Sequence, residues 1–132
     1  MAVTRIDHLV LTVADLERTV AWYREVAQMR HVTFGGGRHA LAFGDQKINL
    51  HLCGREFEPH AATPMPGSAD VCLLVDEAPD ALERRLRELG VAVELGPVTR
   101  DGALGKLTSC YLRDPDGNLV ELGSYGPVGL GG

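Results

Sequence analysis

Residues 5–23 read RIDHLVLTVADLERTVAWY, and this stretch passes from the pattern of a strand to the pattern of a helix. Period-two alternation places four residues on one face of the strand: Ile6, His8, Val10 and Thr12. Asp15 is a good N-cap for the helix that follows, in which apolar residues recur at helical spacing. His8 is thus an imidazole among apolar neighbours, a pattern that on its own also fits a histidine of the core.

The chain has 132 residues, enough for one domain with a core, and it is 45% hydrophobic and 23% charged. Its net charge is −5, and its densest basic cluster, residues 84–87, alternates with glutamates on a predicted helix. We therefore expect no nucleic-acid partner. The three cysteines form no C-x-x-C pair, and no apolar stretch is long enough to span a membrane or to form a signal peptide. These features predict a cytoplasmic protein that does not bind membranes.

The same order of elements occurs twice, as strand, helix, strand, strand and strand. We assign the two units to residues 3–53 and 70–125, joined by a linker at 54–69 and followed by a flexible tail at 126–132. In the first unit we expect a helix ending near residue 28, with later strands at 29–34, 39–43 and 47–53. In the second unit we expect a strand at 70–75, a helix at 78–89 and strands at 91–98, 106–113 and 119–124. Two units of this size are expected to pair their sheets in order to bury a core.

Four residues of metal-ligand type lie at matching places in the two units. Residues 8–13 align without gaps with residues 70–75, which matches His8 with Asp70. Residues 43–52 align with 113–122, which matches His51 with Glu121. If the inward faces of the two sheets meet about a pseudo-two-fold axis, the four side chains converge on one point, and strands are rigid supports for a metal site.

Two imidazoles with one or two carboxylates suit Zn, Ni, Mn, Co or Fe(II), and suit Mg poorly. An unpaired inward carboxylate is costly, so Glu121 in a half-buried strand favours a metal site. Asp70 has an alternative role as a polar residue that starts a strand. Further candidates that share a strand with the ligands or with their neighbours are Lys47, Asn49, Lys106 and Cys110, and the two lysines would contact an anionic substrate unless they are solvated strand ends.

The opening strand and helix, the strand KINLH at 47–51 and the hairpin DPDGNLVE at 114–121 resemble the vicinal oxygen chelate superfamily. This superfamily includes glyoxalase I, bleomycin-resistance proteins, fosfomycin-resistance enzymes and extradiol dioxygenases. The resemblance extends from Arg5 to Tyr125 and is closest to small glyoxalase domain-containing, lactoylglutathione-lyase-like proteins. It implies an α+β fold of two βαβββ units paired into a curved mixed sheet, usually in a homodimer.

The resemblance also implies a divalent metal ion held from the first and fourth strands of each unit. The ligands would be His8 and His51 in the first unit and Asp70 and Glu121 in the second. The chain departs from the family here, because glyoxalase I usually has a carboxylate where His51 stands and a histidine where Asp70 stands. Asp70 is then either a fourth ligand or an acceptor that orients a ligand histidine. Glu121 or Asp70 would act catalytically by moving a proton.

Three functions follow from these observations. The first is a metal-dependent lyase or isomerase that chelates two vicinal oxygens of a small substrate and stabilises an enolate or alkoxide. The second is a metal-independent protein that sequesters an antibiotic or another ligand, although few aromatic residues are available to stack on it. The third is an Fe(II) dioxygenase of extradiol type, because two histidines and a glutamate suit oxygen chemistry.

Overall fold

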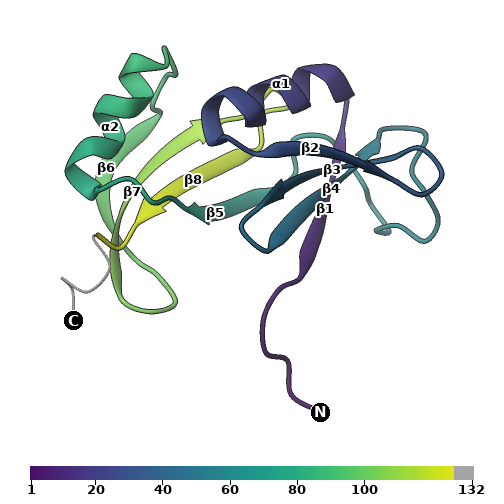
Figure 1. Ribbon diagram of the computed structural model, residues 1–132, viewed down its shortest axis with the longest axis horizontal. Helices are drawn as coiled ribbons and strands as arrows, with labels where there is room; N and C mark the ends of the chain where they lie inside the picture. The colour runs from purple at the N-terminus through teal and green to yellow at the C-terminus, as the bar shows by residue number, and fades with distance from the viewer. Residues whose placement is uncertain (127–132) are drawn as a thin grey trace. The chain divides into compact units, whose positions relative to one another are not determined.

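The computed structural model describes residues 1–126, which form two units with the same order of elements (Figure 1). The first contains β1 (His8–Val13), α1 (Leu16–Ala27), β2 (Arg30–Phe34), β3 (Arg38–Phe43) and β4 (Gln46–Leu52). The second contains β5 (Asp70–Leu74), α2 (Pro79–Glu88), β6 (Leu95–Asp101), β7 (Lys106–Arg113) and β8 (Leu119–Ser124). The predicted α+β fold of two βαβββ units is confirmed.

The compact units comprise residues 1–69 with 115–117, and 70–114 with residues from 118 onward. The predicted tail at 126–132 lies, apart from Gly126, outside the described residues.

In the first unit the strand order is β1-β4-β3-β2, with β1 parallel to β4 and the other pairs antiparallel. Asp15 caps α1, because its carboxylate accepts a hydrogen bond from the backbone N–H of Arg18, at 3.0 Å. The helix ends at Gln28, which adopts the left-handed conformation, and it packs against β2. Apolar residues on one face of the sheet are buried and form the core of this unit: Leu11, Val13, Leu41, Ile48 and Leu50.

The opposite face of this sheet carries the polar residues that the sequence singles out. We call it the His8 face, and it comprises His8, Val10 and Thr12 of β1, Lys47, Asn49 and His51 of β4, and Ala40 and Ala42 of β3. The strand register places these residues side by side, since directly paired residues point to the same face of a sheet. The predicted alternation in β1 and β4 therefore matches the register.

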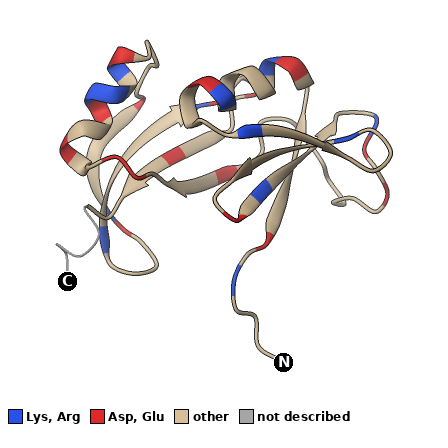
Figure 2. Ribbon diagram, viewed as in Figure 1, with Lys and Arg blue, Asp and Glu red and all other residues tan. Residues whose placement is uncertain are grey.

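In the second unit the strand order is β5-β8-β7-β6, with β5 parallel to β8. Leu82 and Leu86 of α2 are buried, and the helix packs against β7. Its outer surface alternates in charge (Figure 2): Arg87 pairs with Glu83 and Arg85 with Glu88 within the helix, and Arg85 also pairs with Glu77, which precedes it. These pairs agree with the expected solvated helix face.

One strand boundary was predicted wrongly. The sequence indicates a strand at 91–98, whereas β6 spans Leu95–Asp101. A register irregularity lies between Leu95 and Val98, where Pro97 cannot donate to the ladder, and beyond it Asp101 still pairs with Lys106. The pairing with β7 therefore extends the strand to Asp101, beyond the predicted end at residue 98.

The turn that leads into β8 is fixed by its own side chains. The carboxylate of Asp114 accepts hydrogen bonds from the backbone N–H of Asn118, at 2.9 Å, and from the side-chain amide of Asn118, at 2.8 Å. Both residues are buried. This turn therefore positions the strand that carries Glu121.

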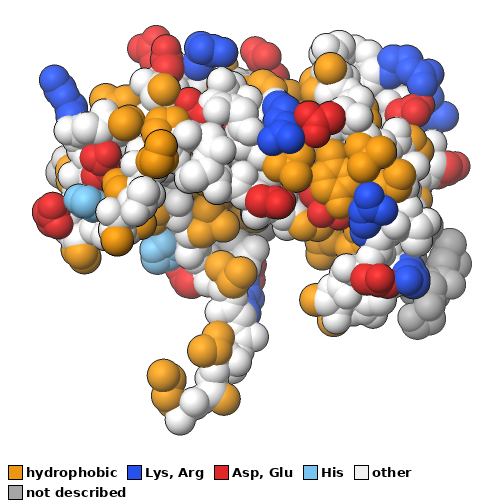
Figure 3. All heavy atoms as spheres, turned by 180° about the vertical axis from the view of Figure 1, so that it is seen from behind, with side chains coloured by type: hydrophobic (Ala, Val, Ile, Leu, Met, Phe, Trp, Pro, Cys, Tyr) orange, Lys and Arg blue, Asp and Glu red, His pale blue; other side chains and the backbone are white. Residues whose placement is uncertain are grey.

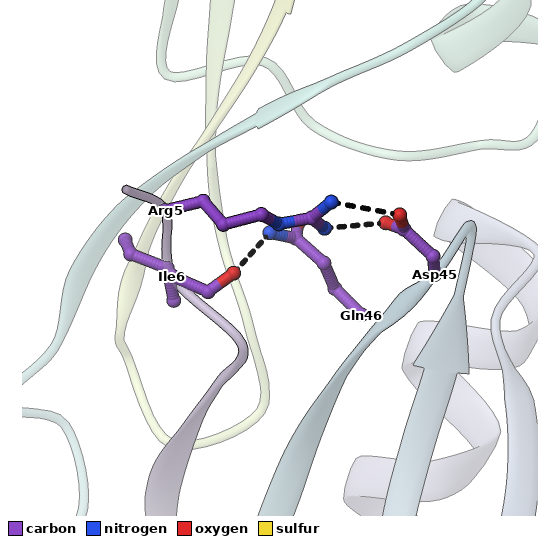
Figure 4. A network of polar contacts seen from close by, with 4 residues as sticks. All are labelled: Arg5, Ile6, Asp45 and Gln46. Carbon is purple, nitrogen blue, oxygen red and sulfur yellow. Dashed lines mark hydrogen bonds and ion pairs between the residues drawn. The ribbon is translucent and has the colours of Figure 1, made fainter. Parts of the chain in front are cut away.

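Hydrogen bonds hold the segment before β1 where it meets the sheet (Figure 4). Arg5 donates two hydrogen bonds to the carboxylate of Asp45, at 2.7 and 2.9 Å, and the side chain of Gln46 donates to the carbonyl oxygen of Ile6, at 2.8 Å. These contacts hold the chain where β1 begins, at His8. Hydrophobic side chains of residues 1–6 are strongly exposed (Figure 3): Met1, Val3 and Ile6.

Candidate functional site

His8 lies at the start of β1 with its imidazole partly exposed, and a neighbouring carboxylate orients it. The distance between His8 Nδ1 and Asp7 Oδ1 is 2.7 Å. This hydrogen bond lowers the pKa of the Asp7 carboxyl. Because Asp7 engages Nδ1, Nε2 is the nitrogen available to coordinate a metal ion, which is the usual arrangement of a metal-ligating histidine with its supporting carboxylate.

His8 and His51 lie on the same face of the sheet but are not adjacent. His8 pairs with Lys47, whereas His51 pairs with Thr12, four residues further along β1. At a strand rise of 3.3 Å per residue this offset separates the two backbone positions by about 13 Å along the sheet, so the two imidazoles would have to lean toward each other along the strands to share one ion. The predicted convergence of these two histidines on one ion is therefore not supported within this unit.

His51 is buried beneath the segment that follows β4. Its ring meets that of Phe57 edge-on, with centroids 5.8 Å apart, and the guanidinium of Arg38 lies 4.6 Å from the centre of the Phe57 ring. Burial, followed by the positive charge of Arg38, lowers the pKa of His51. This covered position therefore favours the neutral form of the His51 imidazole.

Two buried polar atoms on the His8 face have no hydrogen-bond partner within the described residues. They are His51 Nδ1 and Asn49 Oδ1, which lie two residues apart on β4. Unpaired buried polar atoms are costly, so this part of the face is suited to a polar ligand or to ordered water. Lys47 lies on the same face with its ammonium 4.0 Å from the centre of the Phe34 ring, a cation–π contact.

Glu121 lies on the face of the second sheet opposite its buried core. We call this the Glu121 face, and it comprises Cys72 of β5, Glu121 of β8, and Ser109 and Tyr111 of β7. Cys72 and Tyr111 are the direct strand partners of Glu121, one on each side. The hydroxyl of Ser109 donates to Glu121 Oε2 at 2.5 Å, a charge-assisted hydrogen bond that orients the carboxylate.

The pKa of the Cys72 thiol depends in part on this carboxylate. Loss of water around the thiol and the negative charge of Glu121 raise the pKa of Cys72 to about 11. Cys72 is therefore a neutral thiol at physiological pH and a weak nucleophile.

Asp70 is exposed at the start of β5, on the same face as Cys72. It pairs with Leu119, two residues before Glu121, an offset of about 7 Å along the strands. Asp70 and Glu121 thus lie closer in register than His8 and His51 do.

Two residues that were predicted to contact the substrate lie outside the Glu121 face. Cys110 is fully buried, and it is adjacent in β7 to Ser109, whose side chain lies on the Glu121 face, so Cys110 points to the opposite face. Burial raises the pKa of the Cys110 thiol, and the negative charge of Glu83 in α2 raises it further. Lys106 has the same orientation in the alternation and forms an ion pair with Asp101 at the end of the β6–β7 hairpin. Neither residue belongs to the Glu121 face.

The sequence analysis missed the residues that surround Glu121. Cys72, Ser109 and Tyr111 share its face, and Arg100 of β6 donates to the hydroxyl of Tyr111 at 3.1 Å. The period-two pattern already placed Cys72 on the face of Asp70, but the partners on β7 depend on a register that one strand alone does not reveal.

The matching of the two units is also corrected by the register. If His51 corresponds to Glu121, then Thr12 corresponds to Cys72, and Val10 rather than His8 corresponds to Asp70. The gap-free alignment of the first strands is therefore shifted by two residues relative to that of the fourth strands. Within residues 1–126 no group of three or more His, Cys, Asp or Glu side chains is placed to hold a metal ion.

The donor types remain suited to a divalent metal, since a supported imidazole and a supported carboxylate are typical ligands of such ions.

No helix among the described residues is long and apolar enough to cross a membrane. The fold of two βαβββ units is that of a protein of glyoxalase type. The model of the Glyoxalase/Bleomycin resistance protein/Dioxygenase superfamily matches residues 5–122, and the chain belongs to this family.

Three curated relatives are similar over most of the chain. Virulence protein STM3117 of Salmonella typhimurium is 48% identical, over 95% of this chain and 87% of the relative. The glyoxalase domain-containing protein RDO1 of Mycosarcoma maydis is also 48% identical, over 95% of this chain and 70% of the relative. Biphenyl-2,3-diol 1,2-dioxygenase 2 of Rhodococcus globerulus is 31% identical, over 92% of this chain and 63% of the relative.

Solved structures show the same fold. The crystal structure of the Salmonella virulence protein superposes with a TM-score of 0.92, over 95% of this chain and 99% of that one. Lactoylglutathione lyase from Agrobacterium tumefaciens, 26% identical, has a TM-score of 0.70 over 95% and 96% of the two chains. TnmS3, an antibiotic-binding protein from a Streptomyces species, is 27% identical with a TM-score of 0.70 over 94% and 98%.

Proposed function

We propose that this protein is a metal-dependent enzyme that acts on a small substrate with two neighbouring oxygen atoms, as a lyase or isomerase of glyoxalase type. The observation that carries the proposal is that a separate neighbour orients each of two metal-ligand side chains. Asp7 engages His8 Nδ1, and Ser109 donates to Glu121. A hydrogen bond that orients the side chain is typical of metal ligands. Holding a side chain in one orientation also costs conformational entropy, which is expected where a function requires that orientation.

In this proposal His8 of the first unit and Glu121 of the second unit are each metal ligands, and Asp70 is a further ligand or a proton acceptor. The chemistry that the ion supplies when bound is the polarisation of the substrate oxygens and the stabilisation of negative charge on them. The donor set suits Zn, Ni, Mn, Co or Fe(II). His51 is no longer a candidate ligand of the ion bound by His8, because of its register and its cover by Phe57.

Other residues of the His8 face bind and orient the substrate. Asn49, with an unpaired buried oxygen, accepts a hydrogen bond from a substrate hydroxyl, and Lys47 attracts a negatively charged group. Glu121 moves a proton to or from the substrate carbon or oxygen, as a carboxylate held by Ser109 is able to do. Family membership supports a small-molecule substrate.

A homodimer and a cytoplasmic location complete the proposal. Three large apolar side chains before β1 are exposed in the single chain, and burial against a second copy would remove them from water: Met1, Val3 and Ile6. The three cysteines are all free thiols, which suits a reducing compartment. Sedimentation equilibrium of the full chain distinguishes a monomer from a dimer.

Metal analysis of the purified protein tests the central claim. We expect bound divalent metal in the wild type, and loss of that metal in His8→Ala and in Glu121→Gln. His51→Gln should retain it, and so should His60→Ala, a control histidine in the exposed segment after β4. Full occupancy in both the His8 and the Glu121 variants would overturn the proposal.

A dioxygenase reaction is the second candidate, because one relative named as a diol dioxygenase is 31% identical. Consumption of oxygen with catechols and added Fe(II), and none with Ni or Zn, would favour it. Sequestration of an antibiotic is supported by the similarity to TnmS3. It requires tight ligand binding that persists in the presence of a chelator and in His8→Ala.

A further inference from the structure

Two histidines form a contact on the opposite face of the first sheet from His8. His31 of β2 and His39 of β3 lie on neighbouring antiparallel strands, where His31 pairs with Leu41 and His39 pairs with Thr33. They are therefore diagonal neighbours, a relation in which long side chains meet. The core residue Leu41 shows that this face is the buried-core face rather than the His8 face.

The two rings meet through their nitrogens. His31 Nε2 lies 2.9 Å from His39 Nδ1, the ring centroids are 5.1 Å apart, and the ring planes differ by 19°. His31 is exposed and His39 is half-buried, so the pair borders on solvent. One nitrogen of the contact carries a proton and the other accepts it.

We propose that His31 and His39 form a second, two-histidine metal site, selective for divalent ions with 90° ligand geometry such as Ni(II). With metal–nitrogen bonds of 2.0–2.1 Å, two nitrogens that keep their 2.9 Å separation while each ring turns its lone pair toward the ion subtend about 90° there. This is the angle of square-planar and octahedral coordination, and it is smaller than the tetrahedral angle that Zn prefers. Water would complete the coordination sphere, as both side chains reach the surface.

Binding requires no net loss of protons from the neutral pair. The proton between the rings moves to the outer nitrogen of its own imidazole, and both inner nitrogens then donate lone pairs to the ion. The metal ion thus replaces the shared proton. Because β2 is an edge strand of this sheet, the ion would also crosslink the edge to β3 and stabilise the hairpin around residues 35–37.

Titration of the full chain with NiCl2 tests this site independently of the proposed active site. We expect His31→Gln and His39→Gln each to reduce the number of Ni(II) ions bound per chain by one, or to weaken that site by about tenfold or more, because a single imidazole lacks the second linked ligand. His60→Gln, which removes a histidine outside the pair, should bind Ni(II) as the wild type does. The His8→Ala change should remove a different ion and leave this one in place.

Two further measurements decide between a site and non-specific binding. The imidazole signals of His31 and His39 in nuclear magnetic resonance spectra should broaden at lower Ni(II) concentrations than those of His60. Ni(II) should raise the melting temperature of the wild type more than that of His31→Gln. Equal Ni(II) binding by the wild type and both pair variants, with folding confirmed by circular dichroism, would overturn the proposal, as would tighter binding of Zn(II) than of Ni(II) at this pair.

Discussion

In the first unit His8 and His51 are offset by four residues along the paired strands, because His8 pairs with Lys47 and His51 pairs with Thr12. In the second unit Asp70 and Glu121 are offset by only two residues along the paired strands. The two units have the same strand order and the same helix position in the sequence, yet their polar faces differ. A duplicated framework therefore does not imply a duplicated site: if His8 is matched with Asp70, the register matches Asn49 rather than His51 with Glu121.

The environments differ as well as the spacing. His51 is covered by Phe57 and has a lowered pKa, whereas Glu121 lies beside a hydroxyl and a thiol on a partly exposed face. The first environment favours a neutral group that packs and binds through hydrogen bonds. The second holds a carboxylate in a fixed orientation on a face that a ligand can reach.

The largest expected difference concerns stability. Ile48→Ala in the core of the first unit should lower the free energy of unfolding by about 2–5 kcal/mol, because it removes fully buried methyl groups. Glu121→Ala, on a partly exposed face, should lower it by less than about 1 kcal/mol. Urea denaturation of both variants measures this. A large loss of stability in Glu121→Ala would mean that the carboxylate is structural, and would weaken its proposed functional role.

The reactivity of Cys72 should reveal the charge of its neighbour. With a pKa of about 11, this thiol should react with iodoacetamide at pH 8 about a hundredfold more slowly than an ordinary exposed thiol with a pKa near 9. Glu121→Gln should speed the reaction, because the carboxylate no longer opposes formation of the thiolate. Mass spectrometry of the Cys72 peptide gives the rate, and an unchanged rate in Glu121→Gln would contradict the coupling.

Ser109 should affect metal binding without a comparable effect on folding. Ser109→Ala removes the donor to Glu121 Oε2, and we expect metal affinity to fall by about 10- to 100-fold while the free energy of unfolding changes by about 1 kcal/mol. Thr108→Ala, the adjacent residue on the other face of β7, is the matched control. Equal metal affinity of wild type and Ser109→Ala in competition with a chelator dye would show that the hydroxyl does not support the carboxylate.

The smallest expected effect is a change in pH dependence at His51. Its pKa is lowered in the folded protein, so the unfolded chain binds more protons, and stability should fall as the pH drops through about 6.5. His51→Gln should reduce this dependence. His60, whose pKa is raised chiefly by the Ala61 carbonyl, contributes in the opposite direction, so His60→Gln should increase it. Unfolding curves between pH 7.5 and 5.5 in the presence of a chelator measure both slopes. A slope unchanged by His51→Gln would contradict the lowered pKa.

The strands and helices could be predicted from the sequence because their patterns arise from local periodicity. The alternation in residues 6–13 and 47–53, the cap at Asp15 and the turn at 114–118 each depend on neighbours along the chain. The boundary of β6 was misplaced for the opposite reason, since pairing with β7 extends that strand to Asp101. The candidate residues His8 and Glu121 were found by residue type and face, whereas their supporting partner Ser109 was not.

The sequence by itself determined the two βαβββ units, the faces of their strands and the choice of His8, Glu121 and Asp70 as candidate residues. Only the tertiary structure decided that His51 is covered by Phe57, that Cys110 faces the core, and that Ser109 and Cys72 lie next to Glu121. The physical reason is that periodicity assigns a side chain to a face, whereas contacts across strands depend on register. Register is set by pairing between segments that are distant in the chain, and a shift of two residues preserves every face while it changes every neighbour.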